Sequence, residues 1–451
     1  MLGSKAKLSS NVLPAPKKTS GTGSKTVALA SPDPASNTLM QSRLQAWATD
    51  AIAQQKLPCV EILVWHKGKV ICEHHDRGIA TIRSDAGELI YRLYSMTKPI
   101  VTCAAMSLYE EAKFQLDTPV WRILGDKWKK DNMKVVDLAE SVKTKSLVTV
   151  PCRSDITLGQ LLTHTSGLSH GLTDPRQGNI VDGIYAAAGI SGAECILLSP
   201  KETGLPSLQV FCDKLVECPL LFQPGTAWQY SYGLEVMGHA IELLTKKTLE
   251  EFVQERICGP LQMKDTTFFL SKDQELRLCP FYFAKDGMLL PEQTHFPSYC
   301  SGSAGLFSTL RDYSVFCRAM LRGGLGDNGQ RILSPKTVEW MMQNHLHKNG
   351  EESTIRELSI LDQTLPFGFG FGFGAAVAVN TSFDRLIVSK GEWSWAGAAS
   401  TNFWVDPEED IVVVFMTSVL ESDREGFPLT SNLHSLVYGA LDETKAHPKP
   451  T

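Results

Sequence analysis

Patterns typical of β-strands gather at the two ends of this chain and are sparse between them, which limits the possible folds strongly. Near the start, residues 60–65 and 69–72 are apolar stretches on either side of a short turn at 66–68, and this spacing predicts a hairpin. Four stretches near the end also have strand character: 367–379, 385–389, 401–405 and 411–416. We therefore expect an α+β fold whose antiparallel sheet is built from both chain ends and flanked by helices.

Helical patterns lie beside the predicted strands and in the middle of the chain. Apolar residues recur at helical spacing from Asn37, a candidate N-cap, to Gln55. A second helix is predicted from Ser95 to Ala112 and a last helical segment over 429–442. Residues 176–206 are rich in glycine and are expected to form a long loop.

These patterns divide the chain into a leader and two regions of one folded unit. Residues 1–36 are expected to be a disordered leader, because their lysines, prolines and small polar residues offer no apolar core. Residues 37–115 and 300–445 should form the sheet region. Residues 116–299 should form an inserted, mainly helical region with few strands.

Composition argues against several classes of function. The net charge is −5, so charge alone would not attract nucleic acid. The apolar run 411–416 is too short to cross a bilayer, which predicts no transmembrane segment. The eleven cysteines include no C-x-x-C pair, which favours free thiols in the cytoplasm over a disulfide framework or a zinc site. The acid-poor leader leaves a mitochondrial location as the alternative.

The motif that carries chemistry is Ser95-Met96-Thr97-Lys98, an S-x-x-K at the start of an apolar helix. Residues three apart share one helix face, so the hydroxyl and the ammonium can meet. A serine hydroxyl is a weak nucleophile until a neighbour takes its proton. The pattern alone is weak, since it also occurs at Ser4–Lys7 in the leader.

Further motifs give the chain a resemblance to one family. With the S-x-x-K, they are similar in kind and order to those of serine β-lactamases, penicillin-binding proteins and family VIII carboxylesterases. The matching segments are Tyr94–Pro99, Phe114–Val120, Ile156–Leu168, Phe222–Thr226 with Tyr230 and Ser231, Gly259–Met263 with Thr266, Gly302–Thr309 and Trp404–Pro407. The resemblance covers roughly residues 40 to 440 and implies a β-lactamase/transpeptidase-like fold.

The resemblance assigns roles to three distant residues. Ser95 would be the acylated nucleophile, Lys98 its hydrogen-bonded partner, and Tyr230 the general base for attack and general acid for the leaving group. The structural alternative for Tyr230 is a buried aromatic with a satisfied hydroxyl. His164, inside one matched segment, is expected to be structural. Adjacent His74 and His75 would point to opposite faces of a strand and are not expected to bind a metal.

A third motif of the family is a strand carrying K-T-G or a variant. The nearest match is Trp395-Ala396-Gly397, which resembles the W-x-G of the esterases. By that analogy, Trp395 and Gly397 would line the substrate site, and the N–H of Ala398 would form an oxyanion hole with that of Ser95. The alternative is a strand turn rich in Gly and Ala. The lysine of K-T-G is missing, and Tyr232 stands where many members have Asn.

Both departures argue against a specialised antibiotic-resistance enzyme. The resemblance therefore implies a serine hydrolase with an acyl-enzyme intermediate, most simply a carboxylesterase or amidase on a small to medium acyl substrate. Three alternatives stay open: an acyltransferase, a β-lactamase or D-peptidase, and a non-catalytic assembly protein. No metal or organic cofactor is implied, and the oligomeric state stays open.

Overall fold

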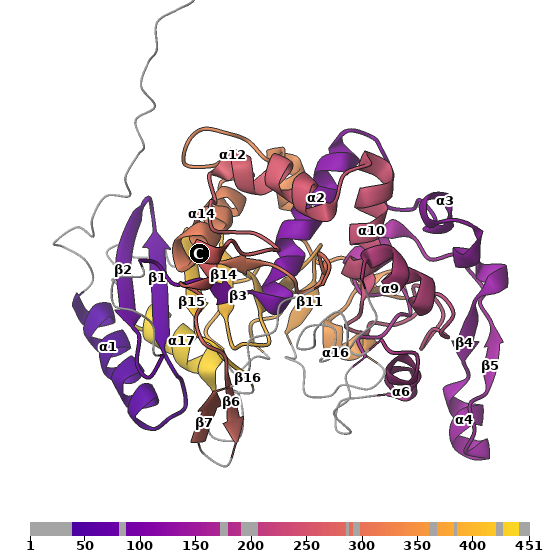
Figure 1. Cartoon of the computed structure of the whole chain (residues 1–451), viewed down its shortest axis with the longest axis horizontal. Coiled ribbons are helices and arrows are strands. Elements are labelled where there is room, and N and C mark those ends of the chain that lie inside the picture. The colour runs from indigo at the N-terminus through magenta and orange to yellow at the C-terminus, as the bar shows by residue number, and fades with distance from the viewer. Residues whose placement is uncertain are drawn as a thin grey trace, which may run out of the picture. The chain divides into compact units, whose positions relative to one another are not determined.

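Seven antiparallel strands form the main sheet of the computed structural model, and the chain enters this sheet from both of its ends (Figure 1). The structure describes residues 38–80, 87–171, 179–190, 206–285, 288–291, 298–359, 368–382, 386–420 and 427–441. The strand order is β11 (Phe369–Phe371), β12 (Ala376–Ala378), β13 (Trp393–Ala396), β14 (Asn402–Asp406), β15 (Ile411–Met416), β1 (Val60–His66) and β2 (Lys69–Asp76). The pairing of β1 with β15 joins the two ends of the chain, which confirms the expected assembly.

The N-terminal hairpin forms where the sequence predicts it. Lys67 and Gly68 both have left-handed backbone angles, with φ of 46° and 89°. Two such residues make the kind of tight turn that matches the twist of antiparallel strands. The hairpin then adds β1 to the central strand β15, all of whose residues are buried.

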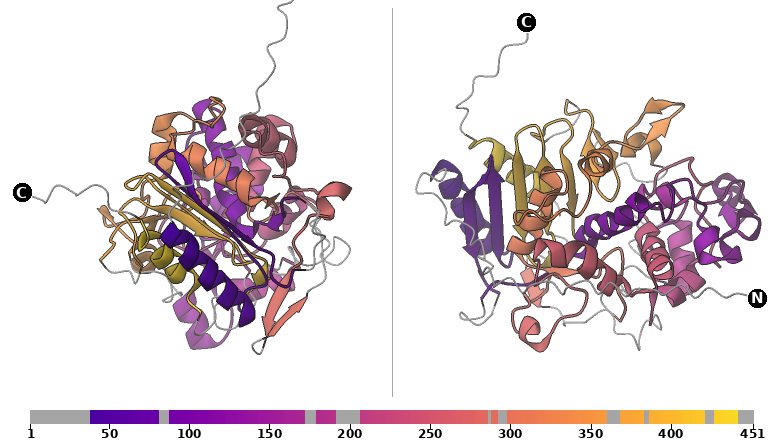
Figure 2. Two further views of the ribbon diagram at one scale, coloured as in Figure 1. Left: turned by 90° about the vertical axis from the view of Figure 1, so that its left-hand side faces the viewer. Right: turned by 90° about the horizontal axis from the view of Figure 1, so that it is seen from above.

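Helices cover both faces of the sheet. On one face, α1 (Thr38–Ala53) and α17 (Leu429–Tyr438) lie together against β1 and β15 (Figure 2). On the other face, α14 (Leu310–Leu321) packs against β14 and β15, beside α2 (Thr97–Glu110). Every residue of α2 from Thr97 to Leu108 is buried. This helix therefore lies in the main core and joins the sheet to the helical region.

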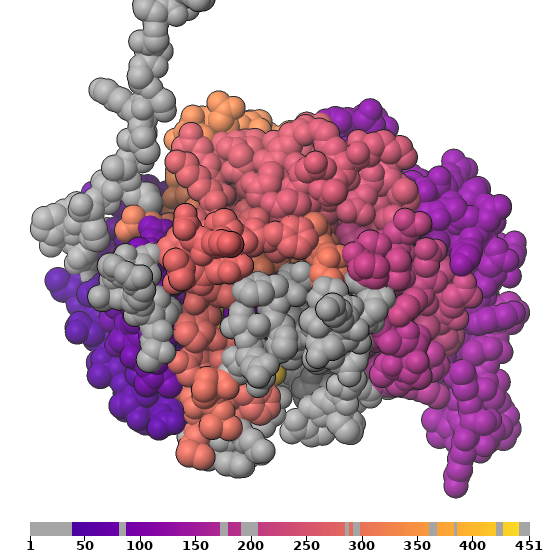
Figure 3. Space-filling view, viewed as in Figure 1, coloured from indigo at the N-terminus to yellow at the C-terminus, as the bar shows by residue number. Residues whose placement is uncertain are grey.

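The helical region is arranged around α10 (Gly233–Thr245). This helix contacts α2, α3 (Trp121–Leu124), α5 (Leu158–Leu162), α9 (Leu208–Leu215) and α11 (Leu249–Val253). A Cβ atom on Gly233 would lie 2.3 Å from the Leu161 carbonyl oxygen, so only glycine allows this close approach of α10 to α5. In the space-filling view, the rose-coloured segment that contains α10 forms much of the upper part of the surface that faces the viewer (Figure 3).

The other described elements are short. They are α4 (Leu138–Thr144), α6 (Ile180–Ala187), α12 (Gly259–Leu261), α13 (Lys272–Glu275), α15 (Pro335–Met341), α16 (Ile355–Leu358), β3 (Tyr91–Arg92), β4 (Lys134–Val136), β5 (Thr149–Pro151), β6 (Tyr282–Lys285), β7 (Met288–Pro291), β8 (Phe307–Ser308), β9 (His347–Lys348), β10 (Glu351–Glu352), β16 (Val419–Leu420), the 3-10 turns Tyr94–Met96, Asp126–Trp128 and Lys130–Asn132, and a π-helical turn at Gln254–Cys258. None of the helices in the described ranges is long and apolar enough to cross a membrane.

Two expectations about strands near the end of the chain are wrong. The stretch 367–379 is not one continuous strand, because the described part folds into the β11–β12 hairpin. Gly370 and Gly372 lie so close to the Asn344 side chain and the Met341 carbonyl oxygen that a Cβ would meet them at 2.1 and 2.3 Å. Residues 386–389 are not in a strand, while 367 and 385 lie outside the described residues.

The middle of the chain also differs from the prediction in detail. The expected loop at 176–206 contains α6, which starts at a capping box formed by Asn179 and Asp182; residues 176–178 and 191–205 lie outside the description. The signal that the sequence analysis missed was this capping pattern, in which Asn179 and Asp182 accept hydrogen bonds from backbone N–H groups at the start of the helix. The antiparallel strand pairs β4–β5 and β6–β7 add strands to a region expected to hold few. The leader and Asn37 lie outside the described residues.

Candidate active site

A sharp bend at Tyr94 presents Ser95. The backbone of Tyr94 is left-handed, with φ of 44°, a conformation that bulky residues rarely adopt. Its buried ring packs against Phe281 with 5.9 Å between centroids, which helps to hold the bend. The chain then makes the 3-10 turn Tyr94–Met96 and enters α2 at Thr97. Ser95 is left half-buried, at the start of a rigid and deeply buried helix.

The ammonium group of Lys98 lies at the centre of the site. The side chain is fully buried. Its Nζ donates to Ser95 Oγ at 3.3 Å and to the Ser303 carbonyl oxygen at 3.0 Å, and it lies 4.4 Å from the ring centroid of Tyr230. The one helical turn between Ser95 and Lys98 thus brings the two groups together, as the sequence spacing predicts.

Tyr230 lies in the loop before α10 and is held by aromatic neighbours. Its ring stacks on His170 at 4.7 Å and packs against His164 at 4.8 Å. Trp395 Nε1 donates to its hydroxyl at 3.4 Å. Among the described residues, Tyr230 and Ser95 form no direct hydrogen bond, and each instead contacts Lys98. Catalytic hydrogen bonds are often long in unliganded proteins and shorten when substrate binds.

The end of β13 lies directly against the segment that leads to Ser95. A Cβ on Gly397 would be 2.3 Å from the Leu93 carbonyl oxygen and 2.3 Å from Thr401 Oγ1, so the close approach requires glycine. Ala398 follows and is exposed. Within the described part of the chain, neither the Ser95 N–H nor the Ala398 N–H donates a hydrogen bond to another protein group.

His164 and His170 both pack against the Tyr230 ring, and both are neutral. Burial, with a smaller effect of the Lys98 charge, lowers the pKa of His164 well below its usual value and that of His170 to about 3. His164 Nδ1 bonds with Ser231 Oγ at 2.9 Å, and its left-handed φ of 58° marks a tight turn. The expected structural character of His164 agrees with these contacts. His170, stacked between Tyr230 and Tyr232, was missed by sequence reasoning.

Glu235 and the turn at Ser301–Ser303 also belong to the site. Neither was predicted as part of it, although Gly302 and Ser303 lie in the matched segment Gly302–Thr309. The Glu235 carboxylate is buried in the first turn of α10 and accepts hydrogen bonds from Ser301 Oγ, from Gly302 N at 2.9 Å and from Ser303 N at 3.4 Å. Burial raises its pKa to about 7, while these hydrogen bonds act in the opposite direction. The sequence did contain a signal for Glu235, because an acidic residue stands on an apolar helix five positions after Tyr230.

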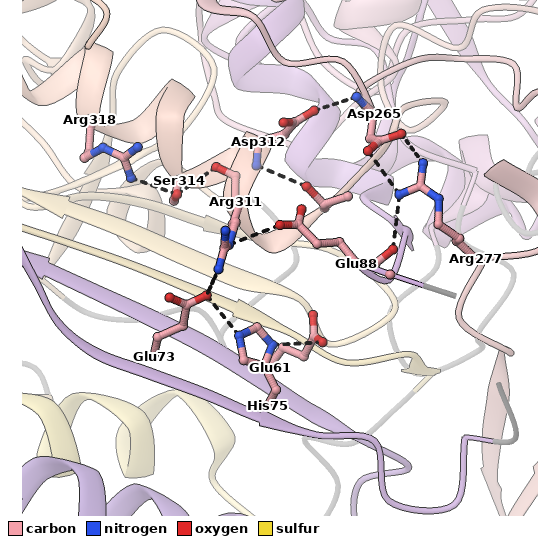
Figure 4. A network of polar contacts seen from close by, with 12 residues as sticks. Glu61, Glu73, His75, Glu88, Asp265, Arg277, Arg311, Asp312, Ser314 and Arg318 are labelled. Carbon is pink, nitrogen blue, oxygen red and sulfur yellow. Dashed lines mark hydrogen bonds and ion pairs between the residues drawn. The ribbon is translucent and has the colours of Figure 1, made fainter. Parts of the chain in front are cut away.

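His75 lies in a network of ion pairs, as Figure 4 shows. Its Nδ1 bonds to Glu61 and its Nε2 to Glu73, each at 3.0 Å. Arg311, from α14, bonds to Glu73 and pairs with Glu88. Both nitrogens of His75 are thus used in protein contacts. Within the described ranges, no group of three or more His, Cys, Asp or Glu residues is placed to hold a metal ion.

Comparison with known proteins identifies the family. A family model described as beta-lactamase matches residues 44–436. Protein Rv1367c of Mycobacterium tuberculosis is 30% identical over 372 residues, which cover 78% of this chain and 84% of that protein. Esterase EstB of Burkholderia gladioli is 26% identical over 299 residues, covering 60% and 68%.

The solved structures agree on the fold. EstCE1, described as a hydrolase with promiscuous acyltransferase activity, matches with a TM-score of 0.71 at 24% identity, covering 89% of this chain and 99% of that one. The expected β-lactamase/transpeptidase-like fold is therefore confirmed, with its antiparallel sheet and flanking helices. Because the matching family model spans most of its length, the chain belongs to the beta-lactamase family.

Proposed function

We propose that this chain is a serine hydrolase that cleaves esters or amides of small to medium acyl groups through an acyl-enzyme on Ser95. One observation carries the proposal: the buried Lys98 ammonium contacts both the Ser95 hydroxyl and the Tyr230 ring. Family membership supports the chemical class, and EstB is a relative whose name describes an esterase. Ser95, Lys98 and Tyr230 are the proposed catalytic residues.

The reaction would take place in two steps. Ser95 Oγ attacks the acyl carbonyl carbon while the Tyr230 oxygen, as general base, accepts its proton. Trp395 Nε1 donates to the Tyr230 oxygen at 3.4 Å, and the Lys98 ammonium lies 4.4 Å from the ring centroid, so both groups place positive charge beside this side chain. The carbonyl oxygen becomes an oxyanion between the N–H groups of Ser95 and Ala398. The bond to the leaving group then breaks, Tyr230 returns the proton to that group, and water cleaves the acyl-Ser95 ester by the same route.

The charges around the site favour uncharged substrates. His164 and His170 are neutral, so they offer no cation to a substrate carboxylate. Trp395 occupies the place where other family members carry the lysine of K-T-G, and Gly397 matches its glycine. Trp395, half-buried beside Tyr230 and Phe371, offers an aromatic wall. We propose that Trp395 and Gly397 line the acyl site, and that neutral acyl esters are preferred to carboxylate-bearing antibiotics.

Ester hydrolysis and active-site labelling test the proposal. Ser95→Ala should abolish turnover of p-nitrophenyl butyrate, because the nucleophile is removed. The Ser4→Ala variant is a matched control, since Ser4 belongs to the second S-x-x-K of the chain. A fluorophosphonate probe should label the peptide that contains Ser95, as mapped by mass spectrometry. Unchanged turnover in Ser95→Ala, or no labelling of folded wild-type protein, would overturn the assignment.

Acyl transfer is the second candidate, and it uses the same acyl-enzyme. EstCE1 is described as a hydrolase with acyltransferase activity. Transfer to an alcohol would replace water in the second step and leave the first unchanged. Product analysis with a p-nitrophenyl ester and added 1-butanol separates the two. A butyl ester as main product would identify a transferase, whereas free acid alone would identify a hydrolase.

Cysteine usage and net charge support a proposed location and partner. We propose a cytoplasmic location, because all ten cysteines in the described residues are unpaired and buried. A small acyl substrate is the proposed partner, and no nucleic acid is expected at a net charge of −5. We also retain the proposed division into a leader at 1–36, a sheet region at 37–115 and 300–445, and a helical region at 116–299.

A further inference from the structure

The positive charge of Lys98 is buried without a direct ion pair. Its side chain is fully inaccessible, and no carboxylate among the described residues lies within ion-pair distance of its Nζ. Its polar contacts are the Ser95 hydroxyl and the Ser303 carbonyl oxygen. A buried charge is costly unless a counter-charge or hydrogen bonds compensate it. The environment of the ammonium must therefore contain a further source of negative potential.

The Ser301–Ser303 turn lies between the Glu235 carboxylate and the Lys98 ammonium. It accepts hydrogen bonds from Ser301 Oγ and from the N–H groups of Gly302 and Ser303. The carbonyl oxygen of the same Ser303 accepts from Lys98 Nζ at 3.0 Å. The N–H of Ser303 thus points toward the carboxylate while its carbonyl meets the ammonium. Hydrogen bonds in such a chain polarise one another and strengthen.

The turn has little freedom to move. A Cβ on Gly302 would lie 2.2 Å from the carbonyl oxygen of Leu234, so the turn lies directly against the start of α10. Ala304 N also bonds back to Ser301 Oγ at 3.1 Å, which closes the turn on itself. Tyr230 lies five residues before Glu235 in the segment that enters α10. The carboxylate therefore fixes the Ser303 carbonyl relative to both Lys98 and Tyr230.

We propose that Glu235 is a positioning residue: through the Ser301–Ser303 turn it holds the Lys98 ammonium against Ser95 and supplies its counter-charge. The inference rests on the proposed function and extends it. Glu235 does not touch Ser95, so its effect is transmitted by the Ser303 carbonyl. Loss of its negative charge would leave Lys98 less well held and Ser95 less reactive.

The titratable groups around Glu235 allow a pH test. The groups that face it are Lys98 from α2, the thiol of Cys212 from α9 and the thiol of Cys300 beside the turn. Burial raises the pKa of both thiols, that of Cys300 to about 12, so they stay neutral near pH 7. With its own pKa raised to about 7, Glu235 should lose its charge as the pH falls through neutrality. Wild-type kcat should then fall below about pH 7.

Glu235→Gln tests the proposal in the full-length protein. This nearly isosteric change should lower kcat for p-nitrophenyl butyrate about 10- to 100-fold, because hydrogen bonds to a charged group are replaced by weaker ones. KM should change little, and the acid limb near pH 7 should disappear. Glu235→Asp, which keeps the charge, should recover part of kcat and retain the limb.

The matched control is Glu250→Gln. Glu250 also accepts backbone and hydroxyl hydrogen bonds, from Phe268 N at 2.7 Å and Thr267 Oγ1 at 3.0 Å, but has no contact with the catalytic residues. It should keep wild-type kcat and the acid limb. The initial rate of fluorophosphonate labelling of Ser95 provides a second readout. This rate is divided by the amount of folded protein in each sample, which circular dichroism measures.

The outcomes separate this inference from the proposed function. Slower labelling and a lost acid limb in Glu235→Gln, but not in Glu250→Gln, would support it. Equal kcat, equal labelling and an unchanged pH profile in both variants would overturn it while leaving Ser95 as the nucleophile. Loss of kcat in Glu235→Gln with the acid limb intact would also overturn it, since a purely structural role predicts that result. The activity of Ser95→Ala tests the proposed function independently.

Discussion

Replacing Gly397 by alanine tests whether the end of β13 must lie against the segment before Ser95. The added Cβ would lie 2.3 Å from the Leu93 carbonyl oxygen, and ordinary van der Waals contact begins at 3.4 Å. The end of β13 and the segment before Ser95 must therefore move apart by about 1 Å to restore ordinary van der Waals contact. Leu93 presents a main-chain atom, so no change of rotamer can relieve the contact.

The separation moves the Ala398 N–H relative to the Ser95 N–H. A misplacement of about 1 Å in a catalytic group can cost about 100-fold in rate, and loss of one oxyanion donor costs about 100- to 1,000-fold. We therefore expect kcat for an aryl ester to fall about 100-fold in Gly397→Ala. KM should change little, because the donor acts mainly on the charge that develops in the transition state.

Steady-state hydrolysis of p-nitrophenyl butyrate measures this effect. The control is Gly183→Ala on α6, where an added Cβ meets nothing within 4 Å. It should keep full kcat and gain a little stability, since alanine favours a helix over glycine by about 1 kcal/mol. If Gly397→Ala hydrolyses the ester at the wild-type rate while its far-UV spectrum is native, Ala398 is not part of the oxyanion site.

Two further predictions concern proton transfer and pH. Tyr230→Phe keeps the ring but removes the hydroxyl, so kcat should fall about 100- to 10,000-fold with little change in Tm; an undiminished kcat in the ester assay would remove Tyr230 from proton transfer. The pKa of His75 is raised to about 9 by its hydrogen bonds to Glu61 and Glu73. Because the folded-state pKa lies above the ordinary value of about 6.5, the stabilisation is complete below about pH 6.5 and is lost as the pH rises through about 9. The Tm difference between wild type and His75→Gln should therefore shrink above that pH, and a constant difference would contradict this.

Short-range patterns in the sequence determined much of the architecture. The S-x-x-K spacing brings Ser95 and Lys98 together because both lie within one helical turn, whatever the rest of the chain does. The turn at 66–68 and the buried strand Ile411–Met416 were also predicted from their own residues. These features depend on local backbone preferences and on burial of apolar side chains, which a sequence displays directly.

Competing local and tertiary preferences explain the errors. Alternating Phe and Gly from 367 to 374 are compatible with one long strand. Instead, close packing against Met341 and Asn344 turns the chain after β11. A strand pattern specifies which face a side chain takes, but not where the strand must end. The loop expected around Ile180–Ala187 became a helix because Asn179 and Asp182 cap its start.

Only the tertiary structure decided which groups surround the buried Lys98. His170, Glu235 and Ser303 come from segments far apart in the chain, and nothing in their local sequence reports their distance from Lys98. Their protonation also depends on burial, which neutralises His170 and gives Glu235 a pKa near neutrality. Local sequence therefore determined the helix that brings Ser95 and Lys98 together. The surrounding charge and polarity follow from long-range packing, because electrostatic interactions depend on distances and desolvation that only the folded chain defines.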